Sequence, residues 1–422
     1  MAIDSTESGP AQTGTSSNES TWGLLAVSAG LVLGITPAQV VPILLGAAVE
    51  SGFPLPWAAG LATAELGSLA WMSWWIGSRL DPTRASGAMM PAFVAVAVGT
   101  GLSAVFAAPE WALLLLATRA LVGLAEGYVV AMIYATIAGL PNAQALYGRA
   151  LQLVILLSVG VLPALAAVAR FGLAGVYGGL AVLAALLAAV FFVARSRAAG
   201  GQAPVPEDRR EAGEAGDTLD VPTWIGLLGA FGAGAVAFGD GLIYAFVQRI
   251  GSGLGLESSI GWMLAASSLC GAVGAGLARR QASERARWGL LLGVASTMGA
   301  ALCVAVAPRL SGAGPVSLLD PETLVFAIGV LGKGASYFFV VTLILGVVAL
   351  WSRAGDSEDR GWAPTVGGLI PLFASLGPLG GAALLAAMGG DFVWLGVGSA
   401  LASVLGLAML WPGAGLAPRP HP

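Results

Sequence analysis

The sequence is poor in the residues that soluble domains and most enzyme active sites use. Only 10% of its 422 residues are charged and 57% are hydrophobic, whereas an average soluble domain has about 25% charged residues. The only histidine, His421, lies at the C-terminus, and the two cysteines, Cys270 and Cys303, fall inside apolar runs. These shortages argue against a histidine-based metal or catalytic centre and against a disulfide framework. We therefore expect no enzyme, no cofactor and no metal site.

Two further features are missing. No glycine-rich loop ends in Lys followed by Ser or Thr, so the sequence does not indicate a phosphate-binding loop or transport driven by ATP. Neither a large soluble domain nor a long polar loop on the side opposite the termini is present to support a membrane sensor. We expect no nucleic-acid partner.

Apolar runs of membrane length fill most of the chain. About twelve of them reach the roughly 20 residues that a membrane-spanning helix needs. Long alternating strands are lacking, so we expect helices that satisfy their own backbone in lipid. The fold class predicted is an all-α polytopic membrane protein with about 12 transmembrane helices. These runs start near Trp22, Pro56, Met89, Trp111, Ala150, Phe171, Pro222, Ser258, Trp288, Glu322, Gly361 and Phe392.

Polar segments divide the chain. Residues 1–21 are polar and lack a basic n-region, which predicts a disordered cytoplasmic tail and not a signal peptide. A mixed-charge segment with two prolines predicts a cytoplasmic linker at 195–221. The domains expected are an N-terminal six-helix bundle at 22–194, a C-terminal bundle at 222–412, and a short cytoplasmic tail at 413–422.

Basic residues predict the orientation. With both termini inside, only Arg170, Arg249 and Arg309 of the loop arginines face outwards, and all the others lie on the cytoplasmic side. This asymmetry agrees with the positive-inside rule. We expect a monomer in a bacterial cytoplasmic (inner) membrane, with the lipid bilayer as its surroundings.

The two halves resemble each other in sequence. Moving the second half back by 201 residues aligns Gln39 with Asp240, and a shift of 209 aligns Gly123 with Gly332. Matches of this kind predict two bundles related by a pseudo-two-fold axis.

Five ionisable residues lie well inside the apolar runs: Glu65, Arg119, Glu126, Asp240 and Lys333. Charge at this depth is costly and therefore suggests function. Arg119 and Glu126 are seven residues apart, about 10 Å along a helix, so each needs a partner from elsewhere. Lys333 is the only lysine in the chain, and an ammonium group can lose its proton where a guanidinium cannot.

Tyrosines accompany the charges at helical spacing. Lys333 and Tyr337 are four residues apart and should point the same way, and Asp240, Tyr244 and Gln248 repeat that spacing in another run.

The loop after the second run carries a recognisable pattern. Its segment Gly-Ser-Arg-Leu-Asp-Pro-Thr-Arg contains Gly77, Asp81 and Arg84. It resembles the cytoplasmic loop signature of the major facilitator superfamily, in which this loop forms a charge lock between the two halves. Pro82 stands where the family usually has a basic residue. The resemblance implies that these three residues form a gating loop.

Other parts of the chain are similar to the same family. Arg119, Gly123 and Gly127 follow its Arg-x-x-x-Gly-x-x-x-Gly pattern, which is associated with proton coupling, and Gly377-Pro378 resembles part of its antiporter motif. In the family that motif belongs to the fifth helix, where this chain has only Gly160 and Pro163, so antiport is not established.

The resemblance also implies a central cavity lined by the first, fourth, seventh and tenth helices. Polar side chains from these helices would then converge on one site. We expect a secondary transporter that moves a small organic solute by alternating access, with protons as the coupling ion. The cations and tyrosines favour an anionic, partly apolar solute. The residues expected to bind it are Lys333, Arg119, Gln39, Tyr244, Tyr337 and Tyr128.

Glu126 and Asp240 are the expected proton-coupling residues. Desolvation favours the neutral form of a carboxyl group and a nearby cation favours the charged form. A carboxylate in a cavity that alternates sides could therefore take up and release a proton.

Other interpretations remain open. Arg119 could lock helices together instead of contacting a ligand, Glu65 could be structural, and the tyrosines could be core residues with a bonded hydroxyl. Within transport, the alternative is a drug/proton antiporter that exports lipophilic or cationic compounds and uses the acidic groups as substrate sites. A membrane sensor or enzyme on the same fold is a third hypothesis.

Overall fold

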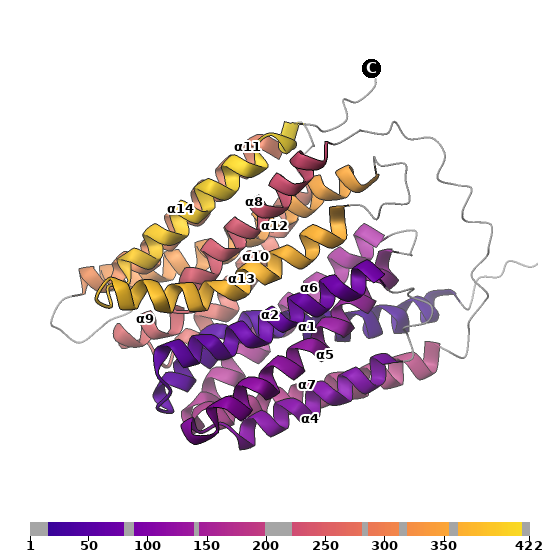
Figure 1. Ribbon diagram of the computed structural model, residues 1–422, viewed down its shortest axis with the longest axis horizontal. Coiled ribbons are helices and arrows are strands. Elements are labelled where there is room, and N and C mark those ends of the chain that lie inside the picture. The colour runs from indigo at the N-terminus through magenta and orange to yellow at the C-terminus, as the bar shows by residue number, and fades with distance from the viewer. Residues whose placement is uncertain are drawn as a thin grey trace, which may run out of the picture.

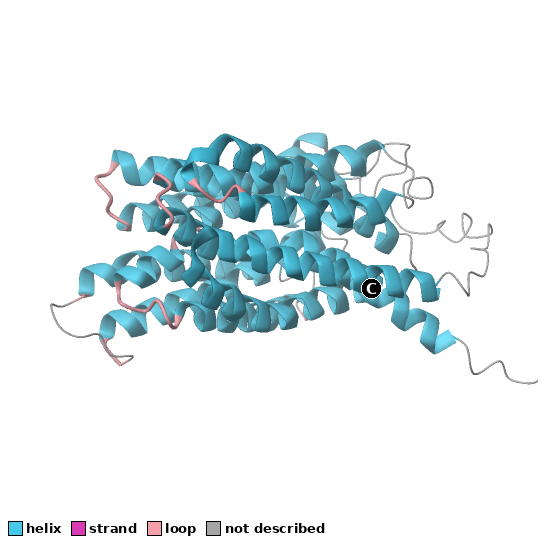
Figure 2. Cartoon of the chain, turned by 90° about the horizontal axis from the view of Figure 1, so that it is seen from below, coloured by secondary structure: helices cyan, strands magenta, loops and turns pink. Residues whose placement is uncertain are grey.

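The computed structural model describes residues 16–79, 88–138, 143–198, 222–280, 286–311, 319–353 and 362–415. Within these ranges the chain consists of helices joined by turns and contains no strand. The helices run side by side along one direction, and most of the described turns between them gather at one end of the molecule (Figure 2).

Every predicted apolar run forms a long helix in the described part of the chain. Nine segments there are long and apolar enough to cross a membrane, and one of them, Gln152–Arg197, covers two consecutive helices. The chain is an integral membrane protein. Its twelve long helices are α1 (Ser16–Glu50), α2 (Leu55–Arg79), α4 (Met89–Val105), α5 (Ala112–Ala138), α6 (Ala143–Val168), α7 (Gly172–Ala198), α8 (Thr223–Tyr244), α10 (Ile260–Arg279), α11 (Ala286–Leu310), α12 (Pro321–Arg353), α13 (Trp362–Ala387) and α14 (Val393–Leu410).

The helices form two bundles of six, one from each half of the chain (Figure 1). The same pairs pack in both bundles: α2 with α5 and α10 with α12, α4 with α7 and α11 with α14, α1 with α7 and α8 with α14. The contacts between bundles obey the same relation, because α2 packs on α13 and α10 packs on α6. The predicted pseudo-two-fold arrangement is therefore confirmed.

Glycines allow the closest helix approaches within the bundles. A methyl group at Gly123 would lie 2.1 Å from the backbone oxygen of Glu65, and one at Gly334 would lie 2.1 Å from the matching oxygen of Ser267. Only glycine leaves room for such crossings. These contacts make Gly334 the equivalent of Gly123. The sequence shift had aligned Gly123 with Gly332, two residues earlier.

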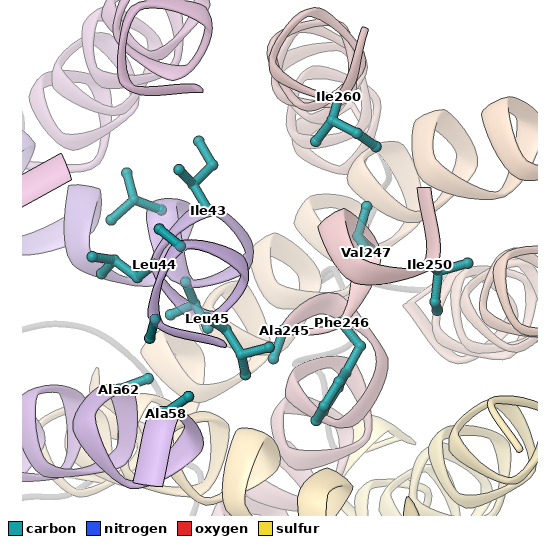
Figure 3. Packing of buried hydrophobic residues seen from close by; sticks show 14 of the residues in the cluster. Ile43, Leu44, Leu45, Ala58, Ala62, Ala245, Phe246, Val247, Ile250 and Ile260 are labelled. Atoms are coloured by element: carbon teal, nitrogen blue, oxygen red, sulfur yellow. The ribbon is translucent and has the colours of Figure 1, made fainter. Parts of the chain in front are cut away.

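At one end of the molecule, the two bundles share a single apolar core. We call this the α9 end, after the short helix α9 (Val247–Gly253) that follows α8. Ile43, Leu44 and Leu45 of α1 pack there in one buried cluster with Phe246 and Ile250 of the C-terminal half (Figure 3). The α9 end is therefore closed by side chains from both halves.

At the opposite end, where α1 begins and α14 ends, the described residues form separate buried cores. One cluster contains residues of the N-terminal bundle only, including Leu31, Phe93 and Phe191. Another contains residues of the C-terminal bundle only, including Val236 and Leu290. In the part of the chain that the structure describes, the core between the bundles is thus continuous at one end and divided at the other.

The element boundaries differ from the prediction in two places. α1 begins at Ser16 and not near Trp22, because a helix can extend into polar sequence beyond the membrane-length apolar run. Ala414, assigned to the C-terminal tail, is buried in a 3₁₀ turn against the C-terminal bundle. Most of the predicted linker, 199–221, lies outside the described residues, as do residues 1–15 of the N-terminal tail.

Candidate functional site

A buried ion pair joins two helices of the C-terminal bundle. Lys333 Nζ of α12 lies 2.5 Å from Asp240 Oδ1 of α8, and the two side chains are 3% and 12% exposed. The i, i+4 spacing read from the sequence places Tyr337 one turn beyond Lys333 and Tyr244 one turn beyond Asp240. The Asp240 carboxylate is close enough to act electrostatically on both phenols.

One of these tyrosines reaches the other bundle. The Tyr244 hydroxyl donates a hydrogen bond of 2.9 Å to the backbone oxygen of Gln39 in α1. The Gln39 side-chain oxygen accepts a hydrogen bond from Ser158 of α6. Among the described residues, the buried Gln39 Nε2 has no hydrogen-bond partner. The site therefore spans both bundles and retains an unused donor on the α1 side.

Gln248 does not continue the face of Asp240 and Tyr244. α8 ends at Tyr244, and two turn residues separate it from α9, which carries Gln248. The Gln248 side chain lies instead against Gly46 of α1. Spacing alone could not predict this, because the i, i+4 relation holds only while the helix is continuous.

A second buried ion pair lies wholly inside the N-terminal bundle. Arg119 of α5 donates to both carboxylate oxygens of Glu65 on α2, with a distance of 3.0 Å for the bond from Nε to Oε2. It also donates to Thr100 and Ser103 of α4, at 3.4 and 3.3 Å. Its guanidinium carbon lies 4.8 Å from the ring centroid of Tyr177 in α7. Arg119 thus links α2, α4, α5 and α7, and is only 1% exposed.

Of the five ionisable residues inside the apolar runs, Glu126 is the third that belongs to this bundle. It is 3% exposed, and its Oε2 atom has no hydrogen-bond partner among the described residues. Together with Glu65 and Arg119 it lines a small cavity between α1, α2, α4, α5 and α7.

The structure thus brings together some predicted residues and separates others. Asp240, Lys333, Tyr244, Tyr337 and Gln39 form one group at the interface between the bundles. Glu126 and Arg119 form another group with Glu65, and every residue lining their cavity belongs to the N-terminal half.

The remaining predicted residues are Tyr128, Gly77, Asp81 and Arg84. Tyr128 is partly buried and packs against the apolar core of the N-terminal bundle. Gly77 lies in the last turns of α2, whereas Asp81 and Arg84 fall outside the described residues. Their gating role stays a prediction.

Sequence reasoning left two important contacts unassigned. It placed Glu65 inside a span but gave it no partner, although Arg119 required one. It did not single out Ser158, which orients Gln39. The spacing of charges along one helix gives no information about the register between helices, so neither contact could be derived from it.

Metal binding has little support in the described part of the chain, where no group of three or more His, Cys, Asp or Glu residues is placed to hold an ion. Cys270 and Cys303 are free and partly buried.

Comparison with known proteins identifies the fold. No protein-family model and no curated protein matches the chain. The structure is similar to that of a POT family transporter in complex with a thioalcohol-conjugated peptide, with TM-score 0.64, 13% identity, and 94% of this chain and 96% of that chain covered. It is also similar to a D-xylose–proton symporter, with TM-score 0.63, 12% identity and coverage of 91% and 96%.

A third similar structure is a partially occluded inward-open form of the xylose transporter XylE from E. coli, with TM-score 0.62, 12% identity and coverage of 92% and 97%. These proteins are major facilitator superfamily transporters. The chain has the major facilitator fold, as the loop and helix patterns in the sequence suggested.

Proposed function

We propose that this protein is a secondary transporter that moves a small organic solute by alternating access, with protons as the coupling ion. The observation that carries this proposal is the buried Asp240–Lys333 pair. One helical turn from Asp240, Tyr244 donates a hydrogen bond to the other bundle. The closed core at the α9 end and the divided core at the opposite end are what one state of an alternating carrier requires.

Charge balance at the pair supplies a reason for coupling. The ion pair is neutral as a unit. An anionic solute that binds Lys333 alone would leave one unpaired negative charge, which is costly in a buried site. A proton that binds Asp240 alone would leave an unpaired ammonium. When solute and proton bind together the site remains neutral, so the least costly loaded state carries both.

The roles follow from this scheme. Asp240 accepts the proton, Lys333 holds the anionic group, and Tyr244, Tyr337 and Gln39 contact the remainder of the solute. Arg119 is better explained as a residue that locks four helices, because Glu65, Thr100, Ser103 and Tyr177 already occupy it.

The alternative, export of lipophilic cations, uses the same pair in the opposite sense. A cation that binds Asp240 would expel the proton of Lys333, and this exchange also keeps the site neutral. Substitution of Lys333 separates the two hypotheses, because an anion carrier needs the ammonium group and a cation exporter does not.

Ligand binding to the purified full chain in lipid nanodiscs would test the proposal. Thermal unfolding is measured with short-chain carboxylates, dipeptides, sugars and lipophilic cations, for wild type and K333M. The matched control is R309M, which removes the cation of an exposed pair with Asp391 in the same bundle. We expect carboxylate-bearing compounds to stabilise wild type and R309M but not K333M.

Stabilisation by cations that survives in K333M would favour the exporter. Stabilisation by none of the four classes, or equally in all three proteins, would contradict a solute site at this pair.

A further inference from the structure

The N-terminal bundle contains a small cavity that the proposed solute site does not use. Its volume is about 20 Å³, enough for about one water molecule. Most of its lining is apolar, and the polar side chains come from α1, α2, α4 and α5. The polar residues that line it are Thr36, Glu65, Thr100, Arg119 and Glu126.

Two polar groups at this cavity lack their usual partners. Glu126 Oε2 is buried without a hydrogen bond among the described residues. On the facing helix, Pro37 lines the cavity and has no N–H, so it leaves the carbonyl of Leu33, another lining residue, without its helical donor. A water molecule between these groups would satisfy both, because it can donate and accept.

The charges around the cavity do not balance. Arg119 is already paired with Glu65 through two hydrogen bonds. The other titratable group near it is the Tyr177 phenol of α7, which stacks under the guanidinium. α1 and α4 contribute only the hydroxyl groups of Thr36 and Thr100. An ionised Glu126 would therefore give the cluster one uncompensated negative charge in an apolar interior.

A positive ion must offset this charge, and the lining favours a proton over a metal ion. Hard metal ions take about six oxygen ligands or more. The cavity offers few oxygens, has room for about one water, and has the Arg119 guanidinium in its wall. A proton on Glu126 needs only an acceptor, which a water bonded to the Leu33 carbonyl provides.

We propose that this cavity is a proton-binding site in which Glu126 carries an exchangeable proton and donates it to one bound water. The role of this site as a second coupling site, separate from Asp240, rests on the proposed transport function. α1 connects the two sites, since Leu33 and Pro37 line the cavity and Gln39 of the same helix accepts the hydrogen bond from Tyr244. A movement of α1 between carrier states would change the access of both.

Infrared difference spectroscopy on the full chain in nanodiscs tests the site without any substrate. We expect an un-ionised carboxyl band at neutral pH that shifts in D₂O, is absent from E126Q, and is unchanged in E110Q, whose glutamate is exposed before α5. Thermal unfolding of E126Q at neutral pH should match wild type, because glutamine resembles the neutral acid.

Several results would overturn the inference. The band could persist in E126Q or be missing from wild type, or E126Q could fail to fold, which would show that a charged glutamate is required. Stabilisation of wild type by NaCl relative to choline chloride, lost in E126Q, would identify a metal ion as the occupant. Because no solute is involved, these outcomes are independent of the thermal-shift screen that tests transport.

Discussion

Removal of one partner of the Asp240–Lys333 pair should destabilise the protein much more than removal of both. At 2.5 Å, two unit charges attract by about 7 kcal/mol in an effective dielectric of about 20. This attraction offsets the several kcal/mol that each ion loses on leaving water. The intact pair therefore contributes little net stability, but either ion alone retains its full desolvation cost.

The expected values follow from burial. K333M leaves Asp240 unpaired and should lose about 3–5 kcal/mol of unfolding free energy. The value should fall in the lower part of that range, because the Asp240 side chain keeps 12% exposure. It should also shrink at acid pH, where Asp240 can take up a proton. The double variant D240N/K333M should unfold at about the wild-type level.

Denaturant titration in mixed micelles, followed by tryptophan fluorescence, would measure these differences. R309M serves as the control, since the Arg309–Asp391 side chains are 60% and 34% exposed and surface pairs contribute little. If D240N/K333M loses as much stability as K333M and D240N lose together, the two charges are not coupled and the ion pair does not act as a unit.

Three further predictions concern other parts of the fold. G123A should lose about 1–3 kcal/mol, because its methyl group would meet the α2 backbone at 2.1 Å, whereas G60A has open space and should unfold like wild type; equal thermal midpoints would contradict this. G261A would bring a methyl group 2.9 Å from the α6 backbone, so spin-label distances across the α9 end should shift towards separated bundles, and an unchanged distribution would count against the closure. The backbone N–H of Val393 and a neighbouring guanidinium lower the pKa of Asp391; its stabilisation is therefore complete above the usual aspartate pKa of about 3.9 and lost as pH falls through the lower folded value. Amide exchange at Val393 should lose protection only at such acid pH, and at every pH in D391A.

Periodicity and charge were enough to predict the helices and which polar residues share a face within one helix. Hydropathy located all twelve long helices, since each must bury its backbone in lipid. The i, i+4 relation paired Lys333 with Tyr337 and Asp240 with Tyr244 within single helices, and the family resemblance implied that the two helices line one cavity. The same resemblance implied that the first helix, which carries Gln39, lines this cavity. In the structure Gln39 accepts the hydrogen bond from Tyr244.

The failures concern relations between helices. Glu126 was grouped with Asp240 because both are isolated acids at similar depth, but depth does not specify the face of the helix. The face depends on how α5 packs on α2, which the close approach at Gly123 determines. The same crossing brings Glu65 to Arg119. A single sequence contains the glycine but not the rotation of the helix that faces it.

The two bundles share a backbone plan but place their charges differently on it. The oxygens of Glu65 and Ser267 meet equivalent glycines, so the residue that binds Arg119 in one bundle corresponds approximately to a serine in the other. Arg119 has partners on three other helices, so this charge stabilises one arrangement of the N-terminal bundle. Among the described residues Lys333 has a single ionic partner, Asp240, and it can exchange either its proton or its counter-ion. The pair that can be broken is therefore in the C-terminal bundle, next to the tyrosine that bonds to the other half. For this reason, binding at Asp240 and Lys333 is expected to alter the contact between the bundles, whereas the Arg119–Glu65 pair should remain intact throughout the cycle.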